Sequence, residues 1–272
     1  MNAEGSSRAR RTAGKRDTKP PGDRRAMTAA VIIPARLGSR RFPRKVLARE
    51  TGKYLVQHVH ERVAGCPGIE RVLIATDSEE VLAACRSFGA EAVLTSEAHA
   101  SGTDRVAEAA ERLPVDVIIN VQGDEPLMEH DDLGMLLDLF GPGEDIVMTT
   151  LAARRTDPEG FHDPNIVKAV VASNGNALYF SRAPVPHPPL AGPLEWLQHI
   201  GIYAYRRGFL LELSRLPPAP LEGRERLEQL RVLDAGRSIR VGVTPHSHIG
   251  IDTEAEYRRF VEEYLRRGRG KA

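Results

Sequence analysis

The sequence predicts an α/β domain with a mostly parallel sheet and a small inserted β-subdomain. In the first half, short apolar runs rich in β-branched residues alternate with helical patterns, which is typical of consecutive βαβ units. These runs lack the polar alternation of a half-exposed strand, as expected for parallel strands covered on both faces. The second half contains a hairpin pattern, and no Gly/Ser-rich linker separates the halves. We therefore expect one continuous domain.

The first half contains the pattern of a strand followed by alternating helices and strands. The expected elements are a strand at 31–33, a helix within 54–67, a strand, helix and strand within 71–95, a helix within 101–113 and a strand within 115–126. Pro34 ends the first strand because it has no N–H for a sheet ladder. Asp77 or Ser78 can cap the helix that follows. Crossovers of this length are right-handed and place helices on both faces of a sheet.

The second half is less regular. The expected elements are strands within 145–155 and 165–186, a Pro-rich loop at 184–193, a strand leading into a helix within 199–213, one helix over 220–236, a strand within 239–245 and a terminal helix within 252–267. "SNGNA" predicts a hairpin turn in which Asn174 and Gly175 adopt positive φ. Asp252 or Thr253 is expected to cap the terminal helix.

The charge distribution disfavours nucleic acid as a partner. The net charge of the 272-residue chain is +1, and residues 1–26 contain eight Lys/Arg and three Asp/Glu, so the remainder carries −4. A general nucleic-acid binder has a basic face on its folded body. We expect the polar, basic, Gly- and Pro-containing segment 1–28 to be disordered and residues 29–272 to form the single domain.

Cysteine use and hydropathy predict a cytoplasmic protein. Cys66 and Cys85 are the only cysteines and have no C-x-x-C spacing, which disfavours disulfides and structural zinc. No segment approaches the roughly 18 apolar residues of a membrane span, and the N-terminus lacks the apolar core of a secretion signal. We therefore expect no membrane partner.

A strongly basic loop follows the first strand. It contains Arg36, Arg40, Arg41, Arg44 and Lys45. Ligands of open α/β sheets bind beyond the carboxyl ends of the strands, and this many cations suit a ligand with several negative charges. A triphosphate is the interpretation we favour, and a solvated basic loop is the alternative. The chain has no G-x-x-x-x-G-K-[ST] and no G-x-G-x-x-G after the first strand, so it is neither an ordinary P-loop enzyme nor a dinucleotide enzyme by motif.

Two aspartates are expected at strand ends. Asp124 in "NVQGDEP" follows a buried strand, and Asp252 in "GIDT" occupies a similar position later in the chain. Carboxylates at one sheet edge can hold Mg²⁺, which completes its shell with water and substrate phosphates. Each residue alone could be a turn or cap residue. Combined with the basic loop, the pair indicates phosphoryl or nucleotidyl transfer.

A series of motifs carries a family resemblance. They are, in order, "IIPAR", "SRRFPRK", "ATD", "SGTDR", "NVQGDEP", "YFSRAPVP", "HIGIYAYR", "PLE", "LEQLR" and "GIDT". From about Val31 to the end, the chain resembles the 3-deoxy-manno-octulosonate (Kdo) cytidylyltransferases, also called CMP-Kdo synthetases. "NVQGDEP" with "HIGIY" and "LEQLR" is specific, whereas "IPAR" also occurs in other nucleotidyltransferases. The resemblance implies a Rossmann-like fold of the nucleotide-diphospho-sugar transferase type.

The resemblance also implies a reaction and its participants. CTP and Kdo would give CMP-Kdo and pyrophosphate, in the pathway that supplies the inner core of lipopolysaccharide, with Mg²⁺ as cofactor and a homodimer as the assembly. By position in the motifs, the nucleotide would contact Arg36, Ser39, Arg41, Lys45 and Gln122. Mg²⁺ would bind Asp124 and Asp252, which with Lys45 and Arg36 are the implied catalytic residues. The sugar acid would contact Arg105, Arg182, His199, Tyr203, Glu228 and Gln229.

The chain departs from the family pattern at two positions. Arg44 stands where the family usually has glycine, which would change the shape of the phosphate loop, and Gln198 replaces a common arginine. The segment between "RAPVP" and "EWLQHIGIY" is also short. Activation of another acidic sugar, such as a sialic acid or an amino-Kdo, therefore remains an alternative. A catalytically silent nucleotide-binding protein on the same fold is another.

Overall fold

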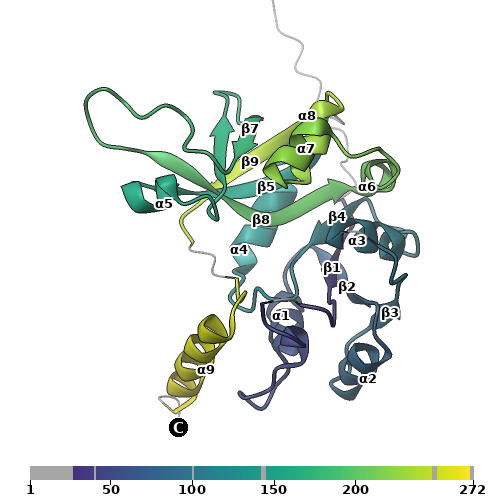
Figure 1. Ribbon diagram of the computed structural model, residues 1–272. Helices are drawn as coiled ribbons and strands as arrows, with labels where there is room; N and C mark the ends of the chain where they lie inside the picture. The colour runs from purple at the N-terminus through teal and green to yellow at the C-terminus, as the bar shows by residue number, and fades with distance from the viewer. Residues whose placement is uncertain (1–26, 40, 100, 142–144, 247–249, 270–272) are drawn as a thin grey trace, which may run out of the picture.

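The computed structural model describes residues 27–39, 41–99, 101–141, 145–246 and 250–269. Within these residues, the strands form one nine-stranded sheet with helices packed around it (Figure 1). The strands are β1 (Ala29–Pro34), β2 (Ile69–Thr76), β3 (Ala92–Leu94), β4 (Val117–Asn120), β5 (Ile146–Arg155), β6 (Lys168–Val171), β7 (Ala177–Ser181), β8 (Trp196–Arg206) and β9 (Ser238–Thr244). The predicted disorder of segment 1–28 concerns mainly residues 1–26, which lie outside the described residues.

Among the described residues, helices occupy every predicted position, and two further helices, which the sequence pattern did not indicate, follow β4 and β5. They are α1 (Leu55–Val63), α2 (Glu79–Ser87), α3 (Gly102–Ala110), α4 (His130–Asp138), α5 (Pro158–His162), α6 (Arg207–Leu213), α7 (Pro220–Glu225), α8 (Gln229–Asp234) and α9 (Glu254–Arg269), with a 3-10 turn η1 (Lys45–Leu47). Ser78 caps α2 by accepting from the Val81 amide. None of the helices in the described segments has the length and apolar character to cross a bilayer.

The sheet confirms the predicted fold class. Its strand order is β3-β2-β1-β4-β8-β5-β9, and four of these six neighbouring pairs are parallel. β8 is the exception on this path, because it runs antiparallel to both β4 and β5. β6 and β7 form the predicted β insertion, an antiparallel hairpin that joins the sheet where Lys168 pairs with Gln198 of β8.

Two apolar clusters fill the space between the sheet and its helices. Val31 and Ile33 of β1 belong to one cluster with residues of α1 and α4, and Ala30 and Ile32 belong to the other with residues of α3 and α6. Because neighbouring residues of a strand point to opposite faces, β1 is buried on both sides. The helices therefore cover both faces, as predicted.

The structure corrects one helix and one turn. The segment predicted as one helix is split into α7 and α8, because Arg226 adopts a left-handed conformation with φ 55°. Such a residue ends a helix, but it is usually glycine, so the sequence pattern did not indicate the break. In the hairpin turn, Gly175 has φ 83°, whereas the positive φ predicted for Asn174 is wrong. Asn174 instead accepts from the Asn176 amide through its side chain.

Candidate active site

The loops after β1 and β4 form a cavity at the carboxyl ends of the two strands. These strands are parallel neighbours, with Ile32 opposite Asn120. The cavity has a volume of about 350 Å³, and the predicted residues that line it are Arg36, Ser39, Lys45, Gln122, Asp124 and Glu228. A Cβ at Gly123 would lie 2.9 Å from the Pro34 carbonyl oxygen, so only glycine allows the loops to approach this closely. The sequence analysis did not single out Gly123.

Lys45 connects the two predicted metal-binding carboxylates. Its Nζ lies 2.5 Å from Asp124 Oδ2 and 3.4 Å from Asp252 Oδ1, and the residue is only 8% exposed. Arg41 approaches Asp252 from the solvent side, with Nη2 2.9 Å from Oδ2. The structure therefore brings together two aspartates that are far apart in the sequence, and basic-loop cations neutralise them.

Thr253, not Asp252, caps the terminal helix. Thr253 Oγ1 accepts from the Glu256 amide, and Glu256 Oε2 accepts in return from the amides of Asp252 and Thr253. The Asp252 carboxylate is therefore available to Lys45 and Arg41. Tyr257 and Phe260 anchor α9 in an apolar cluster with Leu55, which fixes the position of Asp252 relative to the loop.

Glu125 lies beside Asp124 and Asp252, and the sequence pattern did not single it out. Burial, with the charges of Asp124 and Asp252 beside it, raises the pKa of its carboxyl to about 8. The residue directly follows Asp124 in the motif, which was the available signal. Three acidic side chains thus influence one another at this end of the cavity.

The carboxylate pair fits a hard divalent cation that is shared with a substrate. In the described segments, no group of three or more His, Cys, Asp or Glu has an arrangement that could hold a metal ion. Asp124 and Asp252 converge on Lys45 and could supply two oxygen ligands. Mg²⁺ is commonly bound by one or two carboxylates, with substrate phosphates and water as its remaining ligands. The donor set fits Mg²⁺ bound together with a polyphosphate.

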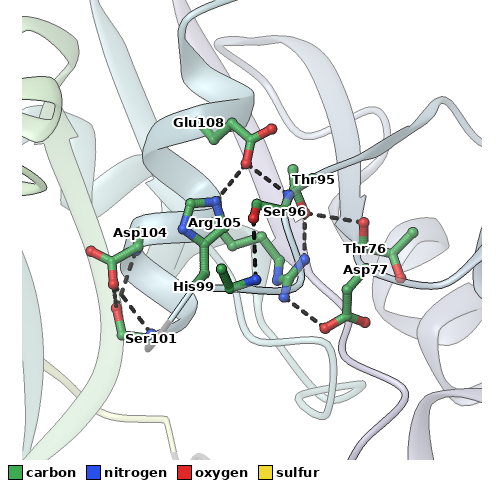
Figure 2. Close-up of polar contacts among 10 residues, drawn as sticks. Thr76, Asp77, Thr95, Ser96, His99, Ser101, Asp104, Arg105 and Glu108 are labelled. Atoms are coloured by element: carbon green, nitrogen blue, oxygen red, sulfur yellow. Dashed lines mark hydrogen bonds and ion pairs between the residues drawn. The ribbon is translucent and has the colours of Figure 1, made fainter.

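Arg36 and Arg105 differ in what their guanidinium groups contact. Arg36 Nη2 is buried and has no hydrogen-bond partner among the described residues, so it can donate to an anion in the cavity that Arg36 lines. Arg105 on α3 is 1% exposed, and its guanidinium binds Asp77, at 2.7 Å, and the Thr95 hydroxyl (Figure 2). In this structure its side chain ties α3 to the ends of β2 and β3, and its contact with substrate stays a prediction.

Arg44 has a left-handed backbone conformation, which glycine adopts more readily than other residues. Its φ is 60° and its ψ is 22°, so the residue is left-handed and immediately precedes η1. The Leu47 amide donates to the Arg44 carbonyl at 2.9 Å, and the guanidinium pairs with Glu80 of α2. Arg44 therefore combines a left-handed backbone, which is strained for a residue with a side chain, with an ion pair to Glu80. Arg40 lies outside the described residues.

His199, Tyr203 and Gln229 form a second group beside the cavity. The Tyr203 hydroxyl lies 3.4 Å from Gln229 Oε1, and Gln229 Nε2 lies 3.5 Å from His199 Nδ1. Thr150 Oγ1 lies 3.1 Å from His199 Nε2, and the ring of Phe180 packs edge-on against the imidazole. Burial lowers the pKa of His199 to about 3, so its imidazole is neutral near pH 7. Burial raises the pKa of the Tyr203 hydroxyl, which stays protonated.

Glu228 connects the two groups. It lines the cavity and directly precedes Gln229 at the start of α8. Part of the side chain is exposed, but its carboxylate faces Thr103 of α3, and burial raises its pKa. The break between α7 and α8 therefore places consecutive residues in the cavity and in the second group.

Arg182 lies in a third group, just beyond β7. Its Nε donates to the Glu225 carbonyl at 2.8 Å and its Nη1 to the Pro164 carbonyl at 2.9 Å. Among the described residues, no carboxylate forms an ion pair with this guanidinium. Its charge is therefore held by neutral acceptors and remains available to an acidic ligand.

A family model described as cytidylyltransferase matches residues 30–239. The chain belongs to the cytidylyltransferase family. The match covers β2 to β8, nearly all of β1, the basic loop and the site residues described above except Asp252; most of β9 lies beyond it.

Named relatives and a solved structure extend this comparison. The cytidylyltransferase is 44% identical over 251 residues to 3-deoxy-manno-octulosonate cytidylyltransferase of Geobacter metallireducens, covering 88% of this chain and 99% of the relative. It is 45% identical over 227 residues to the enzyme of the same name from Syntrophobacter fumaroxidans, with coverage of 82% and 91%. A structure of CMP:2-keto-3-deoxy-manno-octonic acid synthetase complexed with CTP superposes with a TM-score of 0.84 at 38% identity, covering 88% of this chain and 99% of that one.

Proposed function

We propose that this cytidylyltransferase transfers CMP from CTP to Kdo and releases pyrophosphate. The relatives that carry this name align over nearly their whole length, and a structural neighbour holds CTP. The observation that carries the proposal is the convergence of Asp124 and Asp252 on Lys45 at the mouth of the basic loop. This arrangement provides cations for a triphosphate and carboxylates for a metal in one place.

The basic loop would hold the triphosphate. Arg36, Arg41 and Lys45 would pair with phosphate oxygens, and Ser39 and Gln122 would contribute neutral contacts along the cavity. Arg41 and Lys45 would exchange their present carboxylate partners for phosphates when the nucleotide binds. Mg²⁺, held by Asp124 and Asp252, would supply positive charge to the phosphate oxygens. These residues therefore orient the α-phosphorus and stabilise the charge that develops on the departing pyrophosphate.

The second and third groups would orient the sugar acid. Its anomeric hydroxyl oxygen would attack the α-phosphorus in line while the bond to pyrophosphate breaks and the hydroxyl proton passes to solvent. Arg182 would pair with the sugar carboxylate. The neutral imidazole of His199, together with Tyr203 and Gln229, would exchange hydrogen bonds with sugar hydroxyls, and Glu228 would accept another at the boundary with the nucleotide.

We propose the setting of the reaction on the same family basis: the cytoplasm, a homodimer, and the supply of activated Kdo for lipopolysaccharide. CTP and the sugar acid are the proposed partners, rather than nucleic acid or a membrane. Leu178, Leu190 and Leu221 are 62%, 101% and 41% exposed, respectively. They lie on β7, on the loop after it and on α7, and each is an exposed apolar side chain that a contact between two copies could cover.

Pyrophosphate release with CTP and a panel of acidic sugars tests the function. We expect turnover with Kdo to exceed turnover with a sialic acid or an amino-Kdo, and Asp124→Asn provides the inactive control. Faster turnover with another acidic sugar would reassign the substrate. CTP binding without turnover of any sugar would favour a silent nucleotide-binding protein.

A further inference from the structure

Lys168 is a buried cation for which the proposed reaction has no direct use. It begins β6 and is 0% exposed. Its Nζ donates to three backbone carbonyls, those of Asp163 at 3.0 Å, Ile166 at 2.7 Å and Arg182 at 2.8 Å. In the part of the chain that the structure describes, no carboxylate lies within ion-pair distance of this ammonium.

A lysine at this position carries a cost that an apolar residue would avoid. Removing an ammonium from water is strongly unfavourable, and burial lowers the pKa of Lys168 accordingly. All three N–H donors of the ammonium are nevertheless satisfied. A methionine would fill a similar volume, but it would leave three inward-facing carbonyls without this partner. The lysine is therefore explained by the backbone segments that it joins.

Those segments are the ones that hold Arg182. Lys168 binds the carbonyls of Asp163 and Ile166, and the Arg182 guanidinium binds the carbonyl of Pro164 between them. Lys168 also binds the carbonyl of Arg182 itself. Lys168 and Arg182 thus both bind carbonyls of the 163–166 turn. Because Lys168 also binds the Arg182 carbonyl, the backbone and the side chain of Arg182 are fixed relative to each other through that turn.

Glu225 closes the arrangement from the other side. Its carboxylate accepts from the Arg182 amide at 2.8 Å and from Ser181 Oγ at 2.7 Å, while its carbonyl accepts from Arg182 Nε. Glu225 is also the last residue of α7. The left-handed Arg226 follows, and α8 then begins with Gln229, which reaches His199 and Tyr203.

We infer that Lys168 is a positioning residue for the acidic substrate: it fixes Arg182 at the junction of the β6–β7 hairpin, the 163–166 turn and the end of α7. Lys168 itself does not contact the substrate. This inference rests on the proposed function, because it takes Arg182 as the group that binds the sugar carboxylate.

Lys168→Met tests the inference through the two Michaelis constants. The KM for Kdo should rise about tenfold or more, because a small displacement of an orienting group is costly, whereas the KM for CTP should change by less than about twofold. Arg207→Met is the matched control. Arg207 also binds two backbone carbonyls, those of Ala110 and Glu111, but it is the first residue of α6 and joins that helix to the end of α3. It should leave both Michaelis constants near their wild-type values.

A double-mutant cycle separates positioning from general loss of structure. In an Arg182→Ala background, Lys168→Met should add less than about twofold to the KM for Kdo, because the residue that it positions is gone. Full additivity of the two effects would overturn the inference. Equal increases in the Michaelis constants for Kdo and CTP would also overturn it, as would no change in either.

Glu225→Gln provides a second route if Lys168→Met does not fold. The amide retains one acceptor oxygen but places N–H donors against the Arg182 amide or the Ser181 hydroxyl. We expect a selective increase in the KM for Kdo that disappears in the Arg182→Ala background, and an unselective effect would contradict the inference. Wild-type turnover distinguishes the two proposals: absence of Kdo turnover would refute the proposed function, whereas normal turnover with a failed cycle would refute only the positioning role.

Discussion

The proposed phosphate end and the proposed sugar end of the site are held together by different kinds of contact. At the phosphate end, Lys45 and Arg41 pair with Asp124 and Asp252 through side-chain charges. At the sugar end, Arg182 binds backbone carbonyls, and a neutral His199 contacts Gln229. Charged pairs can be exchanged for an incoming triphosphate and its metal, whereas carbonyl and amide contacts hold a preformed shape. Under the proposed function, the difference predicts that the first end reorganises around CTP and that the second end is rigid before the sugar binds.

The largest expected effect comes from removing one carboxylate at the phosphate end. Asp124→Asn or Asp252→Asn should lower kcat by roughly 100-fold or more, comparable to removing one preorganised electrostatic stabiliser. Steady-state kinetics at saturating CTP and Kdo, with circular dichroism as the control for folding, measures this. A folded variant with near-normal kcat would remove that aspartate from the metal site. Full activity after removal of all divalent cations would reject the metal for both.

The two ends also differed in how far the sequence could predict them. The phosphate end follows from local patterns, because the buried strand, Pro34 and the cations lie within one segment, and parallel neighbours end at one sheet edge. The position of Asp252 needed the structure, since only the observed Thr253 cap excludes the cap interpretation. Glu125 was missed because its pKa shift depends first on burial and then on the charges of two other carboxylates.

At the sugar end, the residues were named through the family resemblance, but their geometry was not predictable. The start of α8 depends on a left-handed Arg226, which no glycine signals. The surroundings of Arg182 depend on contacts between the hairpin, a turn and α7 that are distant in sequence. Similarly, the sequence indicated that Arg105 is near the site but not that it is fully buried.

The pH dependence of the free energy of unfolding tests whether His199, at the sugar end, is neutral in the folded protein. The folded pKa of His199 is about 3, below the ordinary value near 6.5 expected when unfolded. The unfolded chain therefore binds a proton that the folded chain excludes. The stability contribution of neutral His199 is complete above pH 6.5 and falls as the pH decreases toward 3, by up to about 1.4 kcal/mol per pH unit.

Urea unfolding at pH 7, 6 and 5 measures this slope. The free energy of unfolding should decrease more steeply with falling pH in the wild type than in His199→Gln, which has no titrating ring. Parallel slopes in the two proteins would show that His199 binds protons equally well in the folded and unfolded states. This result would contradict a neutral His199 in the folded protein.

A smaller effect concerns strain in the phosphate loop. Arg44→Gly and Arg44→Ala both remove the ion pair with Glu80, but only glycine relieves the left-handed backbone. We expect Arg44→Gly to be more stable than Arg44→Ala by about 1 kcal/mol. Thermal unfolding of the two variants side by side measures the difference. Equal stabilities would mean that the loop rearranges around residue 44 without strain.

The smallest expected effect lies outside both ends of the site. Residues 1–26 have no apolar pattern with which to dock, so their deletion should leave the melting temperature and kcat essentially unchanged. Calorimetry and kinetics of the shortened chain measure both. A clear loss of either would mean that the segment supports the folded domain or its site.

Paired kinetics of Lys45→Ala and Arg182→Ala test the division of the site most directly. For each variant, kcat and both Michaelis constants should be measured with CTP and Kdo. Lys45→Ala should lower kcat and weaken the use of CTP, because a cation that contacts the phosphates throughout the reaction is lost. Arg182→Ala should raise the KM for Kdo far more than the KM for CTP. Two results would contradict the account: a change in the KM for Kdo alone in Lys45→Ala, or wild-type kinetics in both variants. Either result would show that the assignment of the Lys45 end to the triphosphate and of the Arg182 end to the sugar acid is wrong.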